Sequence, residues 1–170
     1  MSSVPRKDDV SIASVIVRVA KRQEIDWINT MYNEVEFVHS TFDNEIIAIA
    51  EVNGVKGGVG RLVQVDATIN LELGGMYVFD AYRGKGIARD IVRFLLTLVK
   101  PAQTVYCIPF KHLQDFYKQC GFTDCNMNST VPSKVADKYN WCQKKYPYPT
   151  TLLVLEVPID KTTVEYKNLF

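Results

Sequence analysis

The glycine-rich turn at residues 82–88, Tyr-Arg-Gly-Lys-Gly-Ile-Ala, contains the residue types best suited to binding an anion. It lies between a strongly apolar segment and a stretch with helical apolar spacing. Backbone N–H groups at a helix N-terminus lack intrahelical partners and lie at the positive end of the helix dipole, so they bind phosphate. Gly84 and Gly86 keep Cβ atoms away from a phosphate and tolerate positive φ, while Arg83 and Lys85 add charge. Alternatively, the glycines serve only the backbone of a strand-to-helix turn.

Two motifs relate this turn to a known superfamily. The turn lacks the Lys-Ser/Thr ending of a P-loop, and Arg89 stands where the dinucleotide fingerprint needs a third glycine. It resembles instead the Arg/Gln-x-x-Gly-x-Gly/Ala signature of the GNAT superfamily of N-acetyltransferases, with Arg83, Gly86 and Ala88 at the signature positions. Thirty-four residues after Arg83, Tyr117 begins a segment similar to the superfamily's Tyr-x-x-x-Gly-Phe element.

The resemblance covers roughly residues 14–157 and implies the fold. We expect an α/β (α+β) domain with a mixed, mainly antiparallel sheet, splayed between its fourth and fifth strands, and with helices on both faces. Residues 1–13 are expected to be a flexible segment, and residues 158–170 a C-terminal extension that packs on the domain or on a second subunit. A length of 170 residues suits one domain.

The elements that must position the motifs follow from apolar periodicity. Asn53-Gly54 is a strong hairpin signal, so the sheet begins antiparallel. The later strand, helix, strand, helix order favours parallel pairing of the fourth and fifth strands. The patterns predict strands at 15–19, 45–52, 59–63, 67–79, 104–108 and 151–157, and helices at 22–33, 86–99, 111–119 and 132–146.

Composition limits the other function classes. A net charge of +1, with scattered basic residues, argues against nucleic acid as a partner. The sequence shows neither a signal core nor an apolar stretch near the roughly 18 residues that span a bilayer, so we expect a cytoplasmic protein with no membrane partner. The four cysteines lack Cys-x-x-Cys spacing and only two histidines are present, so we expect free thiols and no metal.

The resemblance also implies acetyl-coenzyme A as co-substrate and assigns two catalytic roles. Amide formation needs an unprotonated amine and a leaving thiolate that can be protonated. Glu72, eleven residues before Arg83, is the implied base; alternatively it is a solvent-facing strand residue, and His39 or water takes the proton. Tyr117, a phenol with an ordinary pKa of about 10, is implied to donate to the thiolate, with a structural aromatic as the alternative.

The implied cofactor contacts are mostly backbone groups. Met76, Tyr77 and Val78 would bind the pantetheine arm as an added strand does, and Gly74-Gly75 would form a bulge there. Many relatives place an asparagine after the fifth strand, where this chain has Pro109-Phe110. The implied phosphate contacts are Arg83, Gly84, Lys85, Gly86, Ile87 and Ala88.

The acceptor side is less defined. Glu34 and Glu36 follow the first predicted helix and could attract a cationic amine, or could belong to an ordinary solvated loop. We therefore predict transfer of acetyl from acetyl-coenzyme A to an amine of a small molecule or peptide by direct attack. The alternatives are a coenzyme-A-binding sensor without turnover and an acyltransferase for longer acyl groups. For the oligomeric state, the sequence leaves both a monomer and a homodimer open.

Overall fold

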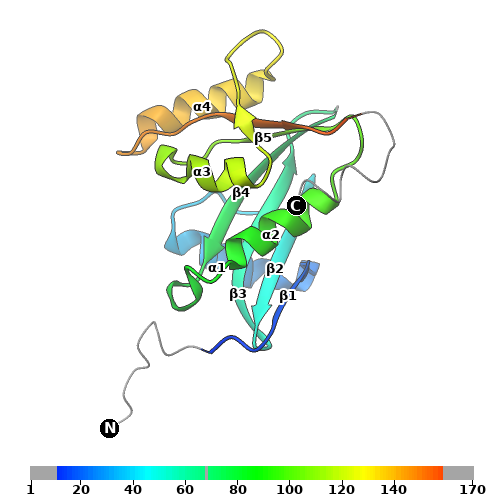
Figure 1. Cartoon of the computed structure of the whole chain (residues 1–170), viewed down its shortest axis with the longest axis vertical. Helices are drawn as coiled ribbons and strands as arrows, with labels where there is room; N and C mark the ends of the chain where they lie inside the picture. Colours follow the sequence, from blue (N-terminus) through cyan, green and yellow to red (C-terminus); the bar gives the residue numbers. More distant parts are fainter. Residues whose placement is uncertain (1–10, 68, 159–170) are drawn as a thin grey trace. The chain divides into compact units, whose positions relative to one another are not determined.

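The computed structural model describes residues 11–67 and 69–158, so most of the predicted N-terminal segment and C-terminal extension lie outside the described residues. The described strands form one sheet in the order β1-β2-β3-β4-β5-β7-β6. Figure 1 labels β1 to β5 and α1 to α4 along the chain. The strands are β1 Val15–Val19, β2 Glu45–Val52, β3 Val55–Gln64, β4 Asn70–Val78, β5 Thr104–Cys107, β6 Thr123–Asp124 and β7 Leu153–Glu156. The α-helices are α1 Ile25–Glu34, α2 Ile87–Thr97, α3 Gln114–Gln119 and α4 Ser133–Lys145.

The predicted fold class is confirmed, because the sheet is mainly antiparallel with one parallel pair, β4 and β5. In this pair Asn70–Leu73 lie opposite Thr104–Cys107. Leu73, opposite Cys107, is the last residue of β4 that pairs with β5, and β4 continues for five more residues to Val78. The closing strand β7 lies between β5 and β6, and Leu153 in β7 is fully buried.

The chain divides into two compact units, with β3 and β4 contributing residues to both. Unit 1 comprises Met1–Arg61 and Gly75–Thr97, and unit 2 comprises Leu62–Gly74 and Leu98–Phe170. Every helix in the described part of the chain is too short or too polar to cross a bilayer.

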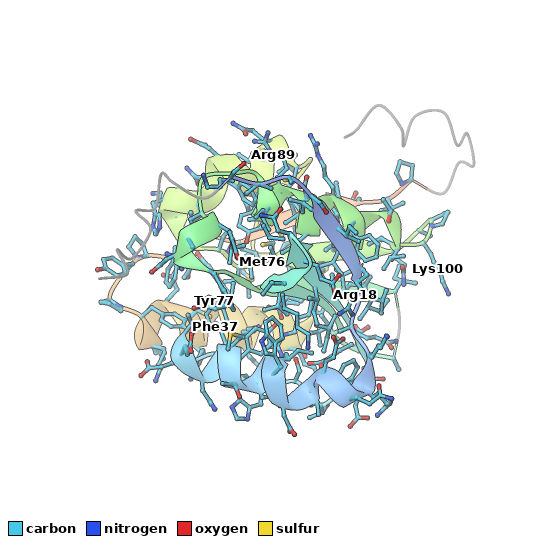
Figure 2. All side chains as sticks on the ribbon, turned by 90° about the horizontal axis from the view of Figure 1, so that it is seen from below. Arg18, Phe37, Met76, Tyr77, Arg89 and Lys100 are labelled. Atoms are coloured by element: carbon cyan, nitrogen blue, oxygen red, sulfur yellow. The ribbon has the colours of Figure 1, made fainter. Side chains whose placement is uncertain are left out.

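In unit 1, α1 and α2 cover opposite faces of the strands. Tyr32 on α1 packs with Ile49 of β2 and Val59 of β3 in one buried cluster. Gly60, next to Val59, faces α2. Neighbouring strand residues point to opposite faces, so the two helices lie on different sides, as Figure 2 shows with α1 in blue below the strands and Arg89 of α2 above them.

Unit 2 has its own core between α4 and the strands. Val135 of α4 packs with Tyr106 of β5 and Leu152, just before β7. Its spacing from Cys142, the other buried residue of α4, is the helical repeat that the sequence showed. This packing holds α4 against the strands of unit 2.

Several predicted boundaries differ from the structure by a few residues, and two of them have a clear local reason. The fourth strand begins at Asn70 instead of residue 67, because a turn precedes it: the Val65 N–H donates to the Asn70 carbonyl, and the Asn70 amide donates to Asp66. The first helix begins as a 3₁₀ turn, Arg22–Glu24, in which the Glu24 carboxylate accepts the Lys21 N–H at 2.8 Å. Both polar caps compete with regular strand or helix hydrogen bonding.

Candidate functional site

The predicted anion-binding turn lies in unit 1 between β4 and α2. A 3₁₀ turn, Asp80–Tyr82, follows β4, and Gly84 and Gly86 then adopt φ values of +76° and +83°. Among the described residues, nothing lies within 4 Å of a Cβ built at either glycine. The glycines therefore supply the positive φ values of the turn and leave its backbone open. The turn leads into α2. The first backbone N–H groups of a helix have no intrahelical acceptor and are suited to bind an anion.

Arg83 closes this turn. Its Nε donates to the Val78 carbonyl at 3.1 Å, and its guanidinium pairs with Asp80 at 3.1 Å. Both side chains are largely exposed, so the pair contributes little stability by itself. Lys85 is also exposed, while Ile87 is buried beneath the turn. The arrangement presents two cationic side chains and a helix N-terminus around an open backbone, which suits a diphosphate.

Close packing of α2 on β3 sets the position of the turn. A Cβ built at Gly60 would lie 2.8 Å from Ile91 Cγ2 and 2.4 Å from Met76 Sδ. A Cβ at Gly58 would lie 3.0 Å from Ile91 Cδ1. Such distances leave no space for a side chain, so these glycines let α2 approach the strand.

The three residues predicted to line the pantetheine arm end β4. The Met76 side chain points toward Gly60, and Val78 is buried with its carbonyl accepting from Arg83. The Tyr77 hydroxyl donates to the Glu34 carboxylate at 3.0 Å. Burial, and then this hydrogen bond, raise the pKa of Tyr77 above its ordinary value. The three side chains thus make contacts within unit 1. This is compatible with the prediction that only their backbone groups bind the pantetheine arm.

Gly75 makes β4 irregular just before these residues. Its φ is +60°, as a bulge or bend requires, and a Cβ there would lie 2.5 Å from the Tyr32 hydroxyl and 2.9 Å from Arg61 Nε. The Tyr32 hydroxyl is buried and has no hydrogen-bond partner among the described residues. Burial raises the pKa of Tyr32, with the nearby Arg61 acting in the opposite direction.

Arg61 is a site residue that the sequence did not single out. It is buried, and its guanidinium lies 4.7 Å from the centre of the Tyr32 ring. It donates to Ser40 Oγ at 2.6 Å and to the Val38 carbonyl at 2.9 Å, and it pairs with Glu45 at 3.4 Å. It therefore holds the loop between α1 and β2 from within. The available signal was an arginine inside an otherwise apolar strand.

The two predicted acceptor residues lie at the start of that loop. Glu34 ends α1 and binds Tyr77, while Glu36 is exposed with a φ of +56°. Phe37 packs at the edge of the same cluster as Tyr77 (Figure 2). His39, considered as an alternative base, lies 2.5 Å from Asn33 Oδ1 through its Nε2. Glu34 thus has a defined partner within unit 1, whereas Glu36 extends into solvent.

In unit 2, Glu72 is buried and ion-paired. Its side chain is 11% exposed, so it does not face solvent as the alternative interpretation had it. One carboxylate oxygen, Oε1, accepts from the ammonium of Lys138 on α4, whose side chain is 44% exposed. The sequence did not associate Lys138 with Glu72, because 66 residues separate them.

Tyr117 is buried on α3 among aromatic rings and thiols. Its ring packs edge-to-face on Phe116 and Phe122. Burial, followed by the thiols of Cys107 and Cys120, raises the pKa of Tyr117 well above its ordinary value. The hydroxyl therefore stays protonated and can only donate or accept a hydrogen bond near neutral pH.

Cys107 links the two predicted catalytic residues of unit 2. Burial, and then the Glu72 carboxylate, raise the pKa of the Cys107 thiol well above its ordinary value. The same thiol is one of the groups that act on Tyr117. Glu72 and Tyr117 thus share a neighbour at the end of β5. The four cysteines, all within the described residues, form no disulfide, and the same residues contain no group of three metal-binding side chains.

The Pro109-Phe110 segment stands where many relatives carry an asparagine. It forms a local β-bridge in unit 2. Phe110 pairs with Thr150 as an isolated bridge, and the Thr151 N–H donates to the Pro109 carbonyl at 2.9 Å. The Phe110 ring stacks on His112 and contacts Tyr146 and Tyr148. This segment therefore supports an aromatic cluster.

Several of the residues described above lie in a sequence range that matches a known family. Residues 43–124 match the family model of the acetyltransferase (GNAT) domain, and this range includes the glycine turn, Glu72 and Tyr117. This part of the chain, just under half of its length, therefore resembles a GNAT acetyltransferase domain. No curated protein matches the sequence.

Solved structures of acetyltransferases share the fold. N-acetylglutamate synthase from Neisseria gonorrhoeae, complexed with coenzyme A and N-acetyl-glutamate, matches over 86% of this chain with a TM-score of 0.66 and 14% identity. The chain spans 36% of the length of that enzyme. Rv2747 from Mycobacterium tuberculosis, in complex with CoA and NLQ, matches with a TM-score of 0.65 and 19% identity over 84% of this chain and 99% of its own.

A third similar structure is Arabidopsis thaliana Naa50 in complex with the bisubstrate analogue CoA-Ac-MVNAL. It has a TM-score of 0.61 and 14% identity over 85% of this chain and 99% of its own. Identities this low establish a common fold and leave the acceptor open.

Proposed function

We propose that this protein is an N-acetyltransferase that transfers acetyl from acetyl-coenzyme A to an amine by direct attack. The observation that carries the proposal is the open turn between β4 and α2, with Gly84 and Gly86 at positive φ and two cationic side chains beside a helix N-terminus. Acetyl-coenzyme A supplies the acetyl thioester, and the turn is assigned to its pyrophosphate. Location in the cytoplasm remains a prediction from the sequence.

Tyr117 is assigned to the leaving group. When the amine nitrogen bonds to the acetyl carbon, the carbon–sulfur bond breaks and coenzyme A leaves as a thiolate. A thiol has an ordinary pKa of about 8.5, below that of Tyr117, which burial has raised. Complete transfer of the phenol proton would thus be uphill, and we assign Tyr117 to donate a hydrogen bond that stabilises the thiolate. The thiolate then takes its proton from solvent.

Glu72 is assigned to the acceptor amine. An ammonium must lose a proton before its nitrogen can attack, and a carboxylate within hydrogen-bond reach can accept it directly or through one water. The buried position of Glu72 near Cys107 supports this assignment. The proton that the ammonium loses before attack passes to Glu72, and the second proton, which the nitrogen loses as the amide forms, passes to solvent.

The acceptor is proposed only as an amine of a small molecule or peptide. Structurally similar proteins have been solved with N-acetyl-glutamate and with a peptide-containing bisubstrate analogue, so the fold accommodates both classes. Glu34 and Glu36 are assigned to attract the amine's positive charge. Because Glu34 already binds the Tyr77 hydroxyl, Glu36 is the freer of the two.

One observation favours the alternative of a coenzyme-A-binding sensor without turnover. Glu72, the assigned base, is already ion-paired with Lys138. A base engaged in this way can hold α4 in place instead of taking protons. Thioester cleavage with a panel of amines separates the two functions, because a sensor binds acetyl-coenzyme A and releases no thiol above the rate without protein.

Binding of acetyl-coenzyme A is tested by thermal unfolding with and without the ligand. A ligand that binds only the folded state stabilises it by RT ln(1 + [L]/Kd), about 2.7 kcal/mol at a hundredfold excess over Kd. Gly86→Glu should abolish this shift by placing a carboxylate at the phosphate position. Gly54→Glu is the matched control, because Gly54 also has positive φ and open space at its Cβ but lies in the β2–β3 hairpin. Equal shifts in both variants would remove the turn from the binding site.

A further inference from the structure

The two side chains of the Lys138–Glu72 ion pair differ in their exposure to solvent. The carboxylate is mostly buried, whereas the lysine side chain reaches solvent along nearly half of its surface. A pair that serves only to anchor α4 gains little from such a position, since exposed pairs contribute about 0–1 kcal/mol and burying a carboxylate is costly. The pair thus presents a fixed negative group next to an accessible positive group.

Both charged groups keep unused hydrogen-bonding capacity. Lys138 binds Glu72 Oε1, and no other bond of either side chain is found among the described residues. A carboxylate has two oxygens and about four acceptor positions, and an ammonium has three donors. Glu72 Oε2 can therefore accept from a second cation, and Lys138 can donate to a second anion, without breaking the existing bond.

Space for a ligand lies beside the pair on the same face of β4. Gly74 is two residues after Glu72, so a side chain there would point to the same side of the strand. A Cβ built at Gly74 would meet only Glu72 Oε1, at 3.5 Å, among the described residues. The absent side chain thus leaves room next to the carboxylate.

We infer that the Lys138–Glu72 pair selects acceptors that carry a carboxylate close to the reacting amine, as free amino acids do. The acceptor ammonium binds Glu72 Oε2, and its carboxylate binds the Lys138 ammonium, so two opposite ion pairs lie side by side. A zwitterion matches this pattern of charge, whereas an amine whose carboxylate is amidated leaves Lys138 without an anion. The inference rests on the proposed N-acetyltransferase function and names its acceptor class.

The charge pattern also explains why Glu72 can hold Lys138 and still act on the acceptor. The acceptor carboxylate draws part of the Lys138 charge away from Glu72. The acceptor ammonium then lies against the free oxygen of the base that must take its proton. Lys138 is in this scheme a specificity-determining residue, and Glu72 has both the binding role and the catalytic role.

The test compares free amino acids with their carboxamides and with the corresponding decarboxylated amines, using thioester cleavage by the full chain. We expect kcat/KM for the free acids to exceed that for the amides by at least about tenfold, which corresponds to about 1.4 kcal/mol. Lys138→Met should reduce this ratio to near one, chiefly through KM, and Lys138→Arg should retain it. Lys134→Met, on the exposed surface of the same helix, is the matched control and should keep the wild-type ratio.

Two further sets of variants control for misfolding and test the space beside Glu72. Lys138→Met leaves a buried carboxylate unpaired, so its thermal unfolding is measured first, and the double variant Glu72→Gln/Lys138→Met restores a neutral pair for binding measurements. Gly74→Ala adds only an ordinary contact and should fold, while it raises KM for the acceptor without changing the Kd of coenzyme A.

Binding of the same amino acids to the protein saturated with coenzyme A, measured by calorimetry, keeps the inference independent of turnover. If no amine supports cleavage, the proposed enzyme function fails, but amino-acid binding that is lost in Lys138→Met still supports the site. If amides and simple amines react as well as free acids, or if Lys138→Met keeps the wild-type preference, the inference is overturned. Absence of both amino-acid binding and acid preference also overturns it.

Discussion

Tyr117 illustrates how burial decides which chemistry a single residue can perform. Its pKa is raised, so over the physiological range it is a neutral phenol and cannot act as a base. A hydroxyl in a water-poor site is nonetheless a strong donor to a developing thiolate. The role assigned to Tyr117 is thus stabilisation by a fixed hydrogen bond.

Tyr117→Phe should lower kcat by about 10²-fold or more while leaving coenzyme A affinity nearly unchanged, because only the hydroxyl is removed. The ratio of wild-type to variant kcat should stay constant from about pH 6 to 9, since the raised pKa keeps Tyr117 protonated throughout. Steady-state kinetics and titration with coenzyme A provide both quantities. Tyr139→Phe, which removes another half-buried hydroxyl, is the control. Equal turnover in wild type and Tyr117→Phe would make Tyr117 a packing residue.

Glu72→Gln should lower turnover by about 10²-fold with coenzyme A affinity intact, because the amide keeps the size of the side chain but accepts no proton. The loss should persist with every acceptor that the wild type uses. Measurements of kcat and of coenzyme A binding by calorimetry separate the two effects. A wild-type rate in Glu72→Gln would assign proton removal to water or to His39.

Single residues were predictable from the sequence where a local motif carries them. The positive φ of Gly84 and Gly86 follows from their positions in a strand-to-helix turn. The burial of Tyr117 was not predicted, since it depends on the rings of Phe116 and Phe122 that pack against it. The partnership of Lys138 with Glu72 was not predictable, since no local pattern relates residues on different elements. The predicted roles themselves await the variants above.

At the scale of elements, apolar periodicity located every α-helix and all but the shortest strand to within a few residues. The boundaries failed where polar side chains cap the chain, as Glu24 does before α1. The position of β7 between β5 and β6 was beyond sequence reasoning, because strand order depends on long-range pairing.

The packing of α2 on β3 affects both the stability of the fold and the binding of coenzyme A. Gly60→Ala should destabilise the fold by about 1–3 kcal/mol, since a Cβ there would overlap with Ile91 and Met76. It should also weaken coenzyme A binding, because α2 carries the phosphate turn. Denaturant unfolding and calorimetry measure the two losses. Gly74→Ala, whose Cβ makes only an ordinary contact, should cost much less, and equal losses in both variants would contradict the packing argument.

For the whole molecule, acidic pH should remove stability through a charge network in unit 1. The Glu24 carboxylate binds Arg18 at 2.7 Å and Lys56 at 3.2 Å. The hydrogen bond from Arg18 is the main reason that the pKa of Glu24 falls from 4.5 to about 2. A depressed pKa gives stability that is present above the unfolded value and is lost as pH falls through the folded one. The unfolding free energy should therefore decline between about pH 4.5 and pH 2.

Glu24→Gln should be less stable than wild type at pH 7 and should lose less stability over that acidic range, because the titrating carboxylate is gone. Urea unfolding at a series of pH values measures both effects. Asp26→Asn removes an exposed carboxylate from the next turn and serves as the control. A parallel decline in wild type and Glu24→Gln would place the acid sensitivity in other carboxylates.

Alkaline pH should remove stability through buried phenols, and Tyr32 tests this most directly. Burial raises its pKa, so its contribution is complete below the ordinary value of about 10 and is lost as pH rises further. Its hydroxyl is buried with no partner in the part of the chain that the structure describes, at a cost of about 1–3 kcal/mol. Tyr32→Phe should therefore be at least as stable as wild type at pH 7 and should decline less above pH 10. Unfolding from pH 7 to 11 measures this, with the exposed Tyr148→Phe as control; a Tyr32→Phe variant that is less stable at pH 7 would mean that the hydroxyl has a partner in solution.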